Sequence, residues 1–310
     1  MKKGSGAVLG AVGEKLHPAP LFGTLPQRAA DYLALTKPRL NSLVIVTAAI
    51  GYYLGSRDTS NVKSLVETVA GVALVAGGAA GLNQLYERDT DGLMRRTRMR
   101  PLAAHRITPG DALIFSSALA AAGLLIVAAT SNLLTAFLTL LTLVSYNVIY
   151  TPMKRRSQLA TLVGAVPGAL PPMIGWVAAR GALTVEAWAL FAIVFVWQIP
   201  HFMAIAWLYR DDFGRAGFPL LPVVEPDGRS TARQAVLFSL LLVPVSLAPY
   251  FVGMTGVAYA VGATAGGIGL LWLAISFALN RADDRARLLF LGSITYLPVL
   301  WGMLIADRLS

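Results

Sequence analysis

The sequence predicts an all-α, polytopic membrane protein in which nine transmembrane helices surround a central cavity. The first observation is composition: of 310 residues, 56% are hydrophobic and only 14% are charged, and the mean hydropathy is +0.63. Soluble domains are far more polar. The second is a succession of nine apolar runs, each long enough to cross a bilayer as a helix. The third is that the charged residues are concentrated between these runs.

The apolar runs follow one another along almost the whole chain. They cover roughly residues 40–56, 66–86, 111–130, 132–150, 158–179, 184–208, 232–252, 255–279 and 286–306. The fifth run is the least regular because glycines and the pair Pro171-Pro172 interrupt it. This pattern indicates either a broken span or close packing between helices. The chain has no cysteine, which excludes disulfides and thiolate metal sites.

Residues 1–30 differ from the rest, being rich in Gly, Pro and small side chains. We expect a loosely ordered cytosolic tail there, followed by one intramembrane domain over residues 31–310. Glu14 and Lys15 interrupt any apolar core near the N-terminus, so a cleaved signal peptide is not expected. Arginine is too sparse for a mitochondrial transit peptide, which favours a bacterial inner membrane.

The net charge of +10 is explained by membrane topology. With a cytosolic N-terminus and nine alternating spans, all of the 26 Lys and Arg residues fall on the cytosolic side except Arg57, Lys63, Arg180 and Arg308. This is the positive-inside pattern. It places the C-terminus on the opposite side of the membrane and removes the need for a nucleic-acid partner.

A polar motif directly follows the second run, with Asn83, Glu87 and Asp91 at i, i+4 and i+8. If the helix continues through it, the three side chains share one face. Oxygen ligands at the end of a lipid-buried helix are costly unless a cation lies among them. Mg²⁺ prefers such a site, often completed by substrate phosphates. The plain alternative is a solvated helix end that pairs with nearby arginines.

Two further charged loops are expected on the same membrane face, because spans two, four and six all run toward it. Asp211 and Asp212 follow span six, and a basic stretch follows span four. Carboxylates and cations above an apolar cavity suit a Mg²⁺-bound diphosphate with an apolar tail, since the cations would neutralise the departing diphosphate. Topology explains the basic stretches equally well. We expect the loops after helices two and six to cap the active site.

One ionisable side chain, His201, lies inside the sixth run. An ionisable residue within a span is a candidate functional group, although a histidine bonded to a neighbouring helix is equally consistent with the pattern. Pro200 precedes it and is expected to kink the helix and leave a carbonyl facing the cavity.

The segment from Asn83 to Asp91, with Met94–Leu102 after it, resembles the first motif of the UbiA-type intramembrane prenyltransferases. Further matches lie at residues 36–39, 150–155, 164–176, 197–202, 209–213 and 216–222, so the resemblance covers roughly residues 31–305. Three positions depart from the family pattern: Glu87 replaces the usual Asp, Phe213 replaces Tyr, and Leu220 replaces Met.

The wider matches resemble the branch of this family that acts on heme. The resemblance implies transfer of a farnesyl group from farnesyl diphosphate to a vinyl group of heme B (protoheme IX), giving diphosphate and heme O for terminal oxidases. It implies Mg²⁺ as cofactor and a heme A synthase or terminal oxidase as assembly partner. The implied roles are Mg²⁺ binding by Asn83, Glu87, Asp91 and Asp212, diphosphate binding by Arg95, Arg98, Lys154 and Arg155, and heme contact by His201.

Two alternatives remain open. A related prenyltransferase acting on a quinone precursor or a chlorophyll-like acceptor would share the fold and the first motif, although residues 197–202 and 216–222 favour the heme branch. A cation-coupled transporter would also place carboxylates near membrane helices. Transporters place ionisable groups near the bilayer midplane between paired broken helices, whereas these carboxylates gather at one surface.

Overall fold

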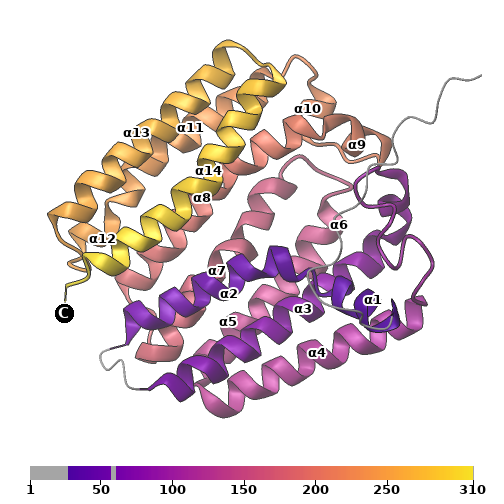
Figure 1. Cartoon of the computed structure of the whole chain (residues 1–310), viewed down its shortest axis with the longest axis horizontal. Coiled ribbons are helices and arrows are strands. Elements are labelled where there is room, and N and C mark those ends of the chain that lie inside the picture. Colours follow the sequence, from indigo (N-terminus) through magenta and orange to yellow (C-terminus); the bar gives the residue numbers. More distant parts are fainter. Residues whose placement is uncertain (1–26, 57–60, 310) are drawn as a thin grey trace, which may run out of the picture.

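The computed structural model describes residues 27–56 and 61–309, and within these ranges the chain is helical, as predicted (Figure 1). Most of the expected N-terminal tail lies outside the described residues. The elements are α1 (Gln27–Leu35), α2 (Pro38–Gly55), α3 (Val62–Leu93), α4 (Pro109–Thr130), α5 (Leu133–Val144), the π-helical turn η1 (Ser145–Tyr150), α6 (Thr151–Met153), α7 (Ala160–Arg180), α8 (Val185–Leu208), α9 (Arg210–Arg215), α10 (Leu221–Val224), α11 (Arg229–Ser246), α12 (Ala248–Phe251), α13 (Val257–Leu279) and α14 (Asp283–Ala306).

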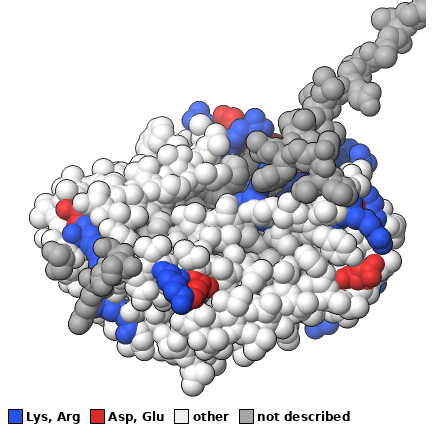
Figure 2. Space-filling view, turned by 60° about the horizontal axis from the view of Figure 1, so that its bottom comes forward, with Lys and Arg blue, Asp and Glu red and all other residues white. Residues whose placement is uncertain are grey.

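The predicted spans correspond to these helices. In the described ranges, eight helices are long and apolar enough to cross a membrane, and α1 with α2 makes a ninth if the bent pair is counted as one span. In Figure 1 the N-terminal helices α2 to α5 lie beside the C-terminal helices α11, α13 and α14, with α7 and α8 between the two groups. Charged side chains on the face in Figure 2 gather in a few groups, and most of the surface between them is uncharged.

The bend of 49° between α1 and α2 has a local cause. Pro38 begins α2, and the residue before a proline is disfavoured in the α-helical conformation. Lys37 leaves the helical conformation and has φ 47 and ψ 55, in the left-handed region. Few residues other than glycine adopt this conformation, and it costs about 1–2 kcal/mol. The break turns the Lys37 side chain toward α3, where it binds Asn83.

Helix α3 is continuous through the polar motif. Its 32 residues make it about 48 Å long, which exceeds the roughly 30 Å of a hydrocarbon core. Asn61 caps its first turn by accepting a hydrogen bond from Ser64 N at 3.1 Å. Because the helix does not break before Leu93, Asn83, Glu87 and Asp91 share one buried face.

The irregular fifth run forms a continuous helix, α7, that packs closely against α2. The helix runs through Pro167, Pro171 and Pro172 without ending. The close packing has a direct basis: a Cβ atom on Gly175 would collide with the Ala48 carbonyl oxygen of α2. Small residues allow such close approach where no hydrophobic force drives helices together in lipid. Of the two interpretations of this run, the structure therefore favours close packing.

Gly175→Ala is expected to destabilise the protein by about 1–3 kcal/mol, because the added methyl group overpacks the contact between α2 and α7. Unfolding of the purified protein in mixed detergent micelles measures the change. Gly302→Ala is the matched control, because nothing lies within 4 Å of a Cβ at Gly302. Equal stability of the two variants would contradict the close-packing account.

Candidate active site

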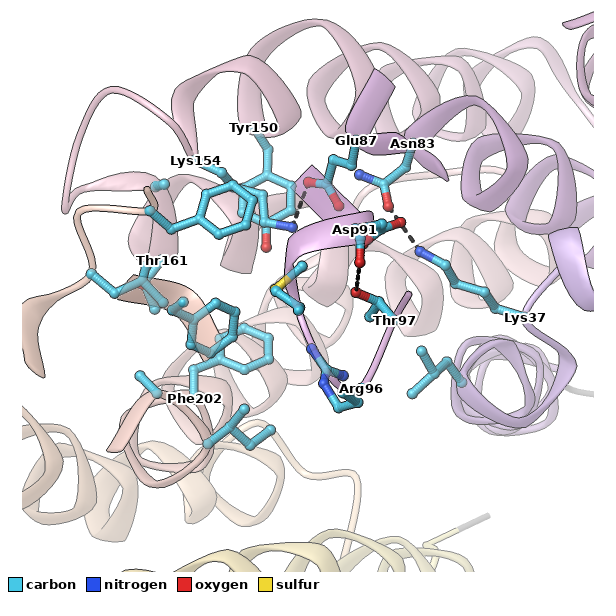
Figure 3. Close-up of a pocket in the computed structure, with 18 of the residues that line it drawn as sticks. Lys37, Asn83, Glu87, Asp91, Arg96, Thr97, Tyr150, Lys154, Thr161 and Phe202 are labelled. Carbon is cyan, nitrogen blue, oxygen red and sulfur yellow. Dashed lines mark hydrogen bonds and ion pairs between the residues drawn. The ribbon is translucent and has the colours of Figure 1, made fainter. Parts of the chain in front are cut away.

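A cavity of about 250 Å³ opens at the end of the bundle where α3 ends (Figure 3). Its wall is polar on one side and largely apolar on the other. The polar and phenolic lining residues are Lys37, Asn83, Glu87, Asp91, Arg96, Thr97, Arg100, Tyr146, Tyr150, Lys154 and Thr161, and the apolar ones are Leu40, Met94, Ala160, Phe202, Ile205, Ala206, Phe213, Phe218 and Leu220.

The polar side is built on α3. Asn83, Glu87 and Asp91 all line the cavity, and each is less than 5% exposed. Buried carboxylates are stable only when they are paired, and here each of the two carboxylates meets a cation from a different segment. Lys154 donates to Glu87 Oε1 at 2.7 Å.

The other two members of the α3 face also accept hydrogen bonds from basic side chains. Lys37, at the bend between α1 and α2, donates to Asn83 Oδ1 at 2.8 Å. Arg100 Nη1 donates to both oxygens of Asp91 at 2.7 Å. The Asp91 backbone carbonyl also accepts from Thr97 Oγ1 at 2.9 Å, which holds the loop after α3 against the helix end.

Two loops meet over the cavity, one following α3 and the other following α8. Met94 of the first loop packs with Ala216 and Phe218 of the second. Arg96 of the first loop lies over the Tyr209 ring, 5.2 Å from its centroid. Burial lowers the pKa of Arg96, and the neighbouring Arg100 lowers it further.

An aromatic part of the wall begins at the π-helical turn η1. Its residues Tyr146 and Tyr150 place their rings 5.5 Å apart. The Lys154 ammonium lies 5.2 Å from the centroid of Tyr150 and 5.5 Å from that of Phe218. Burial alone would lower the pKa of Lys154, but Tyr150 and Glu87 raise it above its usual value. Short π-helical segments often occur at functional sites.

The remaining carboxylate of the predicted metal set lies apart from this face. Asp212 is buried, and its side chain pairs with Arg215 in the same helical turn. It is absent from the cavity wall, although the next residue, Phe213, lines it. In the described parts of the chain, no three His, Asp or Glu side chains are grouped closely enough to hold a metal ion.

The donor set on α3 nevertheless suits Mg²⁺. This ion commonly takes only one or two carboxylates from a protein and completes its shell with water and substrate phosphates. Asn83, Glu87 and Asp91 supply one amide oxygen and two carboxylates on one face of the cavity. Glu87, which replaces the family's usual Asp, keeps its carboxylate in this cavity.

The basic residues singled out from the sequence divide into two groups. Lys154 lines the cavity, whereas Arg95, Arg98 and Arg155 are exposed and absent from its wall. The diphosphate-binding role of these three arginines stays a prediction. Five other residues also line the cavity. Lys37, Arg96, Arg100 and Tyr150 lie in segments that resemble the family but were given no role from the sequence, and Tyr146 was not predicted.

His201 also lies outside this cavity wall. Its Nδ1 is 2.8 Å from Ser293 Oγ, and that hydroxyl donates to the Phe290 carbonyl at 2.7 Å. With the hydroxyl hydrogen on the Phe290 carbonyl, Nδ1–H is the donor to Ser293, and in the neutral imidazole Nε2 is then unprotonated. The imidazole ring stacks between Trp197 and Phe290, with centroids 5.0 and 5.2 Å away. The expected bond to a neighbouring helix is present, and heme contact stays a prediction.

Comparison with known proteins decides the family. The model of the UbiA prenyltransferase family matches residues 44–294. The chain belongs to the UbiA prenyltransferase family. It is therefore an integral membrane prenyltransferase, and the cavity beside α3 is the candidate active site of this family member.

Two individual relatives show which members of the family the chain resembles. The chain is 47% identical to the protoheme IX farnesyltransferase of Solibacter usitatus, with 90% of this chain and 98% of that protein covered. It is 42% identical to the enzyme of the same name from Koribacter versatilis, with 90% and 93% covered.

Solved structures agree on the UbiA fold. A UbiA homolog from Archaeoglobus fulgidus bound to GPP and Mg²⁺ has a TM-score of 0.65 at 18% identity, covering 89% of this chain and 99% of that one. A digeranylgeranylglyceryl phosphate synthase has a TM-score of 0.77 at 15% identity, covering 91% and 98%. At these identities the likeness concerns the fold alone.

Lys154→Met is expected to cost about 3 kcal/mol of stability, because it leaves the buried Glu87 carboxylate without its cation. Unfolding in mixed micelles measures this, and Arg155→Met, which removes the exposed neighbouring cation, should change stability little. Adding Glu87→Gln to Lys154→Met should restore most of the loss. A double variant as unstable as Lys154→Met alone would contradict the pairing.

Proposed function

We propose that this chain is a Mg²⁺-dependent farnesyltransferase that joins farnesyl diphosphate to a vinyl group of heme B, releasing diphosphate and giving heme O. The observation that carries the proposal is the buried face of Asn83, Glu87 and Asp91, surrounded by cations at the mouth of a partly apolar cavity. The choice of farnesyl donor and heme acceptor rests on the names of the similar proteins.

The charge balance of the cavity supports a diphosphate ligand. Three cations line it, namely Arg96, Arg100 and Lys154, against the two carboxylates Glu87 and Asp91, and the amine of Lys37 lies in the same wall. The excess of positive charge suits an anion, and Arg and Lys donors are strong partners for phosphate oxygens. Arg95, Arg98 and Arg155 lie exposed on the adjoining segments, where they would attract the anionic substrate toward the cavity.

Asn83, Glu87 and Asp91 would hold Mg²⁺, with Asp212 contributing from the second loop if its side chain leaves Arg215. When bound, the ion would neutralise the negative charge that develops on the leaving diphosphate. The chain's own cations do the same work from the other sides. Lys154 and Arg100 are placed to turn from the carboxylates to the phosphate oxygens, because both already lie in the cavity wall.

The aromatic wall suits the carbon that loses the diphosphate. As the C–O bond breaks, its electron pair leaves with the diphosphate and positive charge develops on the allylic carbon. The faces of Tyr150 and Phe218 already hold the Lys154 ammonium, so they are electrostatically suited to a cation. The vinyl group of heme then supplies the electron pair for the new C–C bond. Water adds to the resulting cation and loses a proton to solvent, which leaves a hydroxyl group.

The cavity volume of about 250 Å³ lies below the roughly 300–1,000 Å³ of ordinary ligand sites. It accommodates the diphosphate and the reacting end, so the rest of the farnesyl chain and the porphyrin would lie between helices. His201 is next to Phe202, which lines the cavity, and its unprotonated Nε2 makes no hydrogen bond within residues 27–56 and 61–309. It would contact heme through this nitrogen.

The charge distribution supports a location for the reaction. Most basic residues fall on the side of the loops that cover the cavity, which indicates that this face is cytosolic. We place the protein in a bacterial inner membrane with the N-terminus in the cytosol and the C-terminus on the other side.

Expression of this chain in a host that lacks its own heme O synthase is expected to produce heme O, detected by mass analysis of extracted hemes. Asp91→Asn should reduce the yield at least about 100-fold, since a principal electrostatic group is lost. Asp89→Asn is the matched control, because Asp89 lies on the same helix end with its side chain 83% exposed. Normal heme O formation by Asp91→Asn would overturn the metal-site assignment. A prenylated quinone in place of heme O would overturn the acceptor.

Removal of divalent cations is expected to stop diphosphate release by the purified enzyme. A chelator should abolish the release from farnesyl diphosphate and heme B, and an excess of Mg²⁺ should restore it, because the leaving group needs the added charge. Turnover that continues unchanged in the chelator would contradict Mg²⁺ dependence.

A further inference from the structure

A second polar cavity, of about 640 Å³, lies at the opposite end of the bundle. Helices α2, α7 and α8 connect the two cavities. On α7, Ala160 lines the first and Trp176 the second, which separates them by about 24 Å along the helix. The second cavity is therefore a separate site near the other membrane surface, on the side of α12 and the C-terminus in Figure 1.

The clearest sign of a missing ligand is Arg180, in the last turn of α7. Its guanidinium lies over the Trp176 ring, 5.3 Å from the centroid. Its Nε is buried without a hydrogen-bond partner, and within the described ranges the side chain forms no ion pair or hydrogen bond. Arginine carries five donors, and leaving a buried charged donor unpaired is costly.

Two other residues of this cavity wall support the presence of a ligand. Trp176 is 3% exposed, and its indole N–H is buried with no acceptor. Glu186, in the first turn of α8, lines the cavity and has no ion-pair partner among the described residues. Arginine and glutamate thus share one cavity without pairing with each other.

A second arginine, Arg308, lines the same cavity and is held by hydrogen bonds to the backbone. Arg308 donates to the Tyr53 carbonyl at 2.9 Å and to the Ser56 carbonyl, and it lies over the Tyr53 ring, 5.0 Å from the centroid. These bonds fix its guanidinium in the cavity wall. Arg180 and Arg308 are also the described arginines that the positive-inside pattern does not explain.

We propose that this cavity binds the headgroup of a membrane phospholipid, with its phosphate on Arg180 and Arg308. Arginine pairs with phosphate through two parallel hydrogen bonds. The apolar wall residues Ile305 and Leu309 are 37% and 54% exposed, where they would meet the acyl chains. Glu186 would accept from an ammonium group, which favours a phosphoethanolamine headgroup. This site is independent of the proposed farnesyl transfer.

The test is lipid binding to the delipidated full-length protein in non-ionic detergent, measured by native mass spectrometry and by the change in Tm. Phosphatidylethanolamine is expected to bind and raise the Tm of the wild type, and Arg180→Gln should weaken this binding at least tenfold. Lys63→Gln is the matched control, because Lys63 is an exposed cation on the same membrane side and outside the cavity wall. Equal binding by Arg180→Gln and Lys63→Gln would overturn the proposal.

A second variant and a second ligand test which group of the lipid is recognised. Glu186→Gln should remove any preference for phosphatidylethanolamine over phosphatidylglycerol while both lipids still bind. Retention of that preference would overturn the ammonium assignment. Inorganic phosphate at the same concentration should raise the Tm less than the lipid does. An equal effect of phosphate would mean a free-anion site and would overturn the headgroup assignment.

Discussion

The site depends on one constraint: the buried carboxylates of α3 must be paired with cations from other segments. A charge at the end of a lipid-buried helix is unstable without a partner, so the chain must bring cations to it. Lys37 comes from the bend before α2, Arg100 from the loop after α3, and Lys154 from the segment after η1. Three segments far apart in sequence are thereby drawn around one helix face, and their meeting forms the cavity.

Close packing in the membrane provides the rigid frame for this arrangement. The contact of Gly175 with Ala48 holds α7 against α2, and the same two helices contribute Thr161 and Leu40 to the cavity wall. The π-helical turn η1 changes the helical phase just before Lys154, where Tyr146 and Tyr150 enter the cavity. Backbone geometry therefore decides which side chains reach the substrate.

Hydropathy alone predicted the all-α class and the spans, because lipid demands long apolar helices. Helical periodicity predicted the shared face of Asn83, Glu87 and Asp91, since α3 continues to Leu93. Periodicity could not predict which arginines of the next loop line the cavity. Topology places many basic residues there, and only the folded path of the loop brings Arg96 and Arg100 into the cavity wall and keeps Arg95 out of it. The Lys37-Pro38 step was the available signal for Lys37, because a residue before proline is forced from the helix.

The ion pairs around α3 also govern what can enter the cavity. A bare divalent cation would approach Glu87 and Asp91 against the positive charges of Arg96, Arg100 and Lys154, and it would have to displace Lys154 and Arg100 with nothing to receive them. A metal already bound to diphosphate brings acceptors for those displaced donors. The site is thus matched to the complex rather than to either ion alone, so metal and prenyl donor would arrive together and leave as metal and diphosphate.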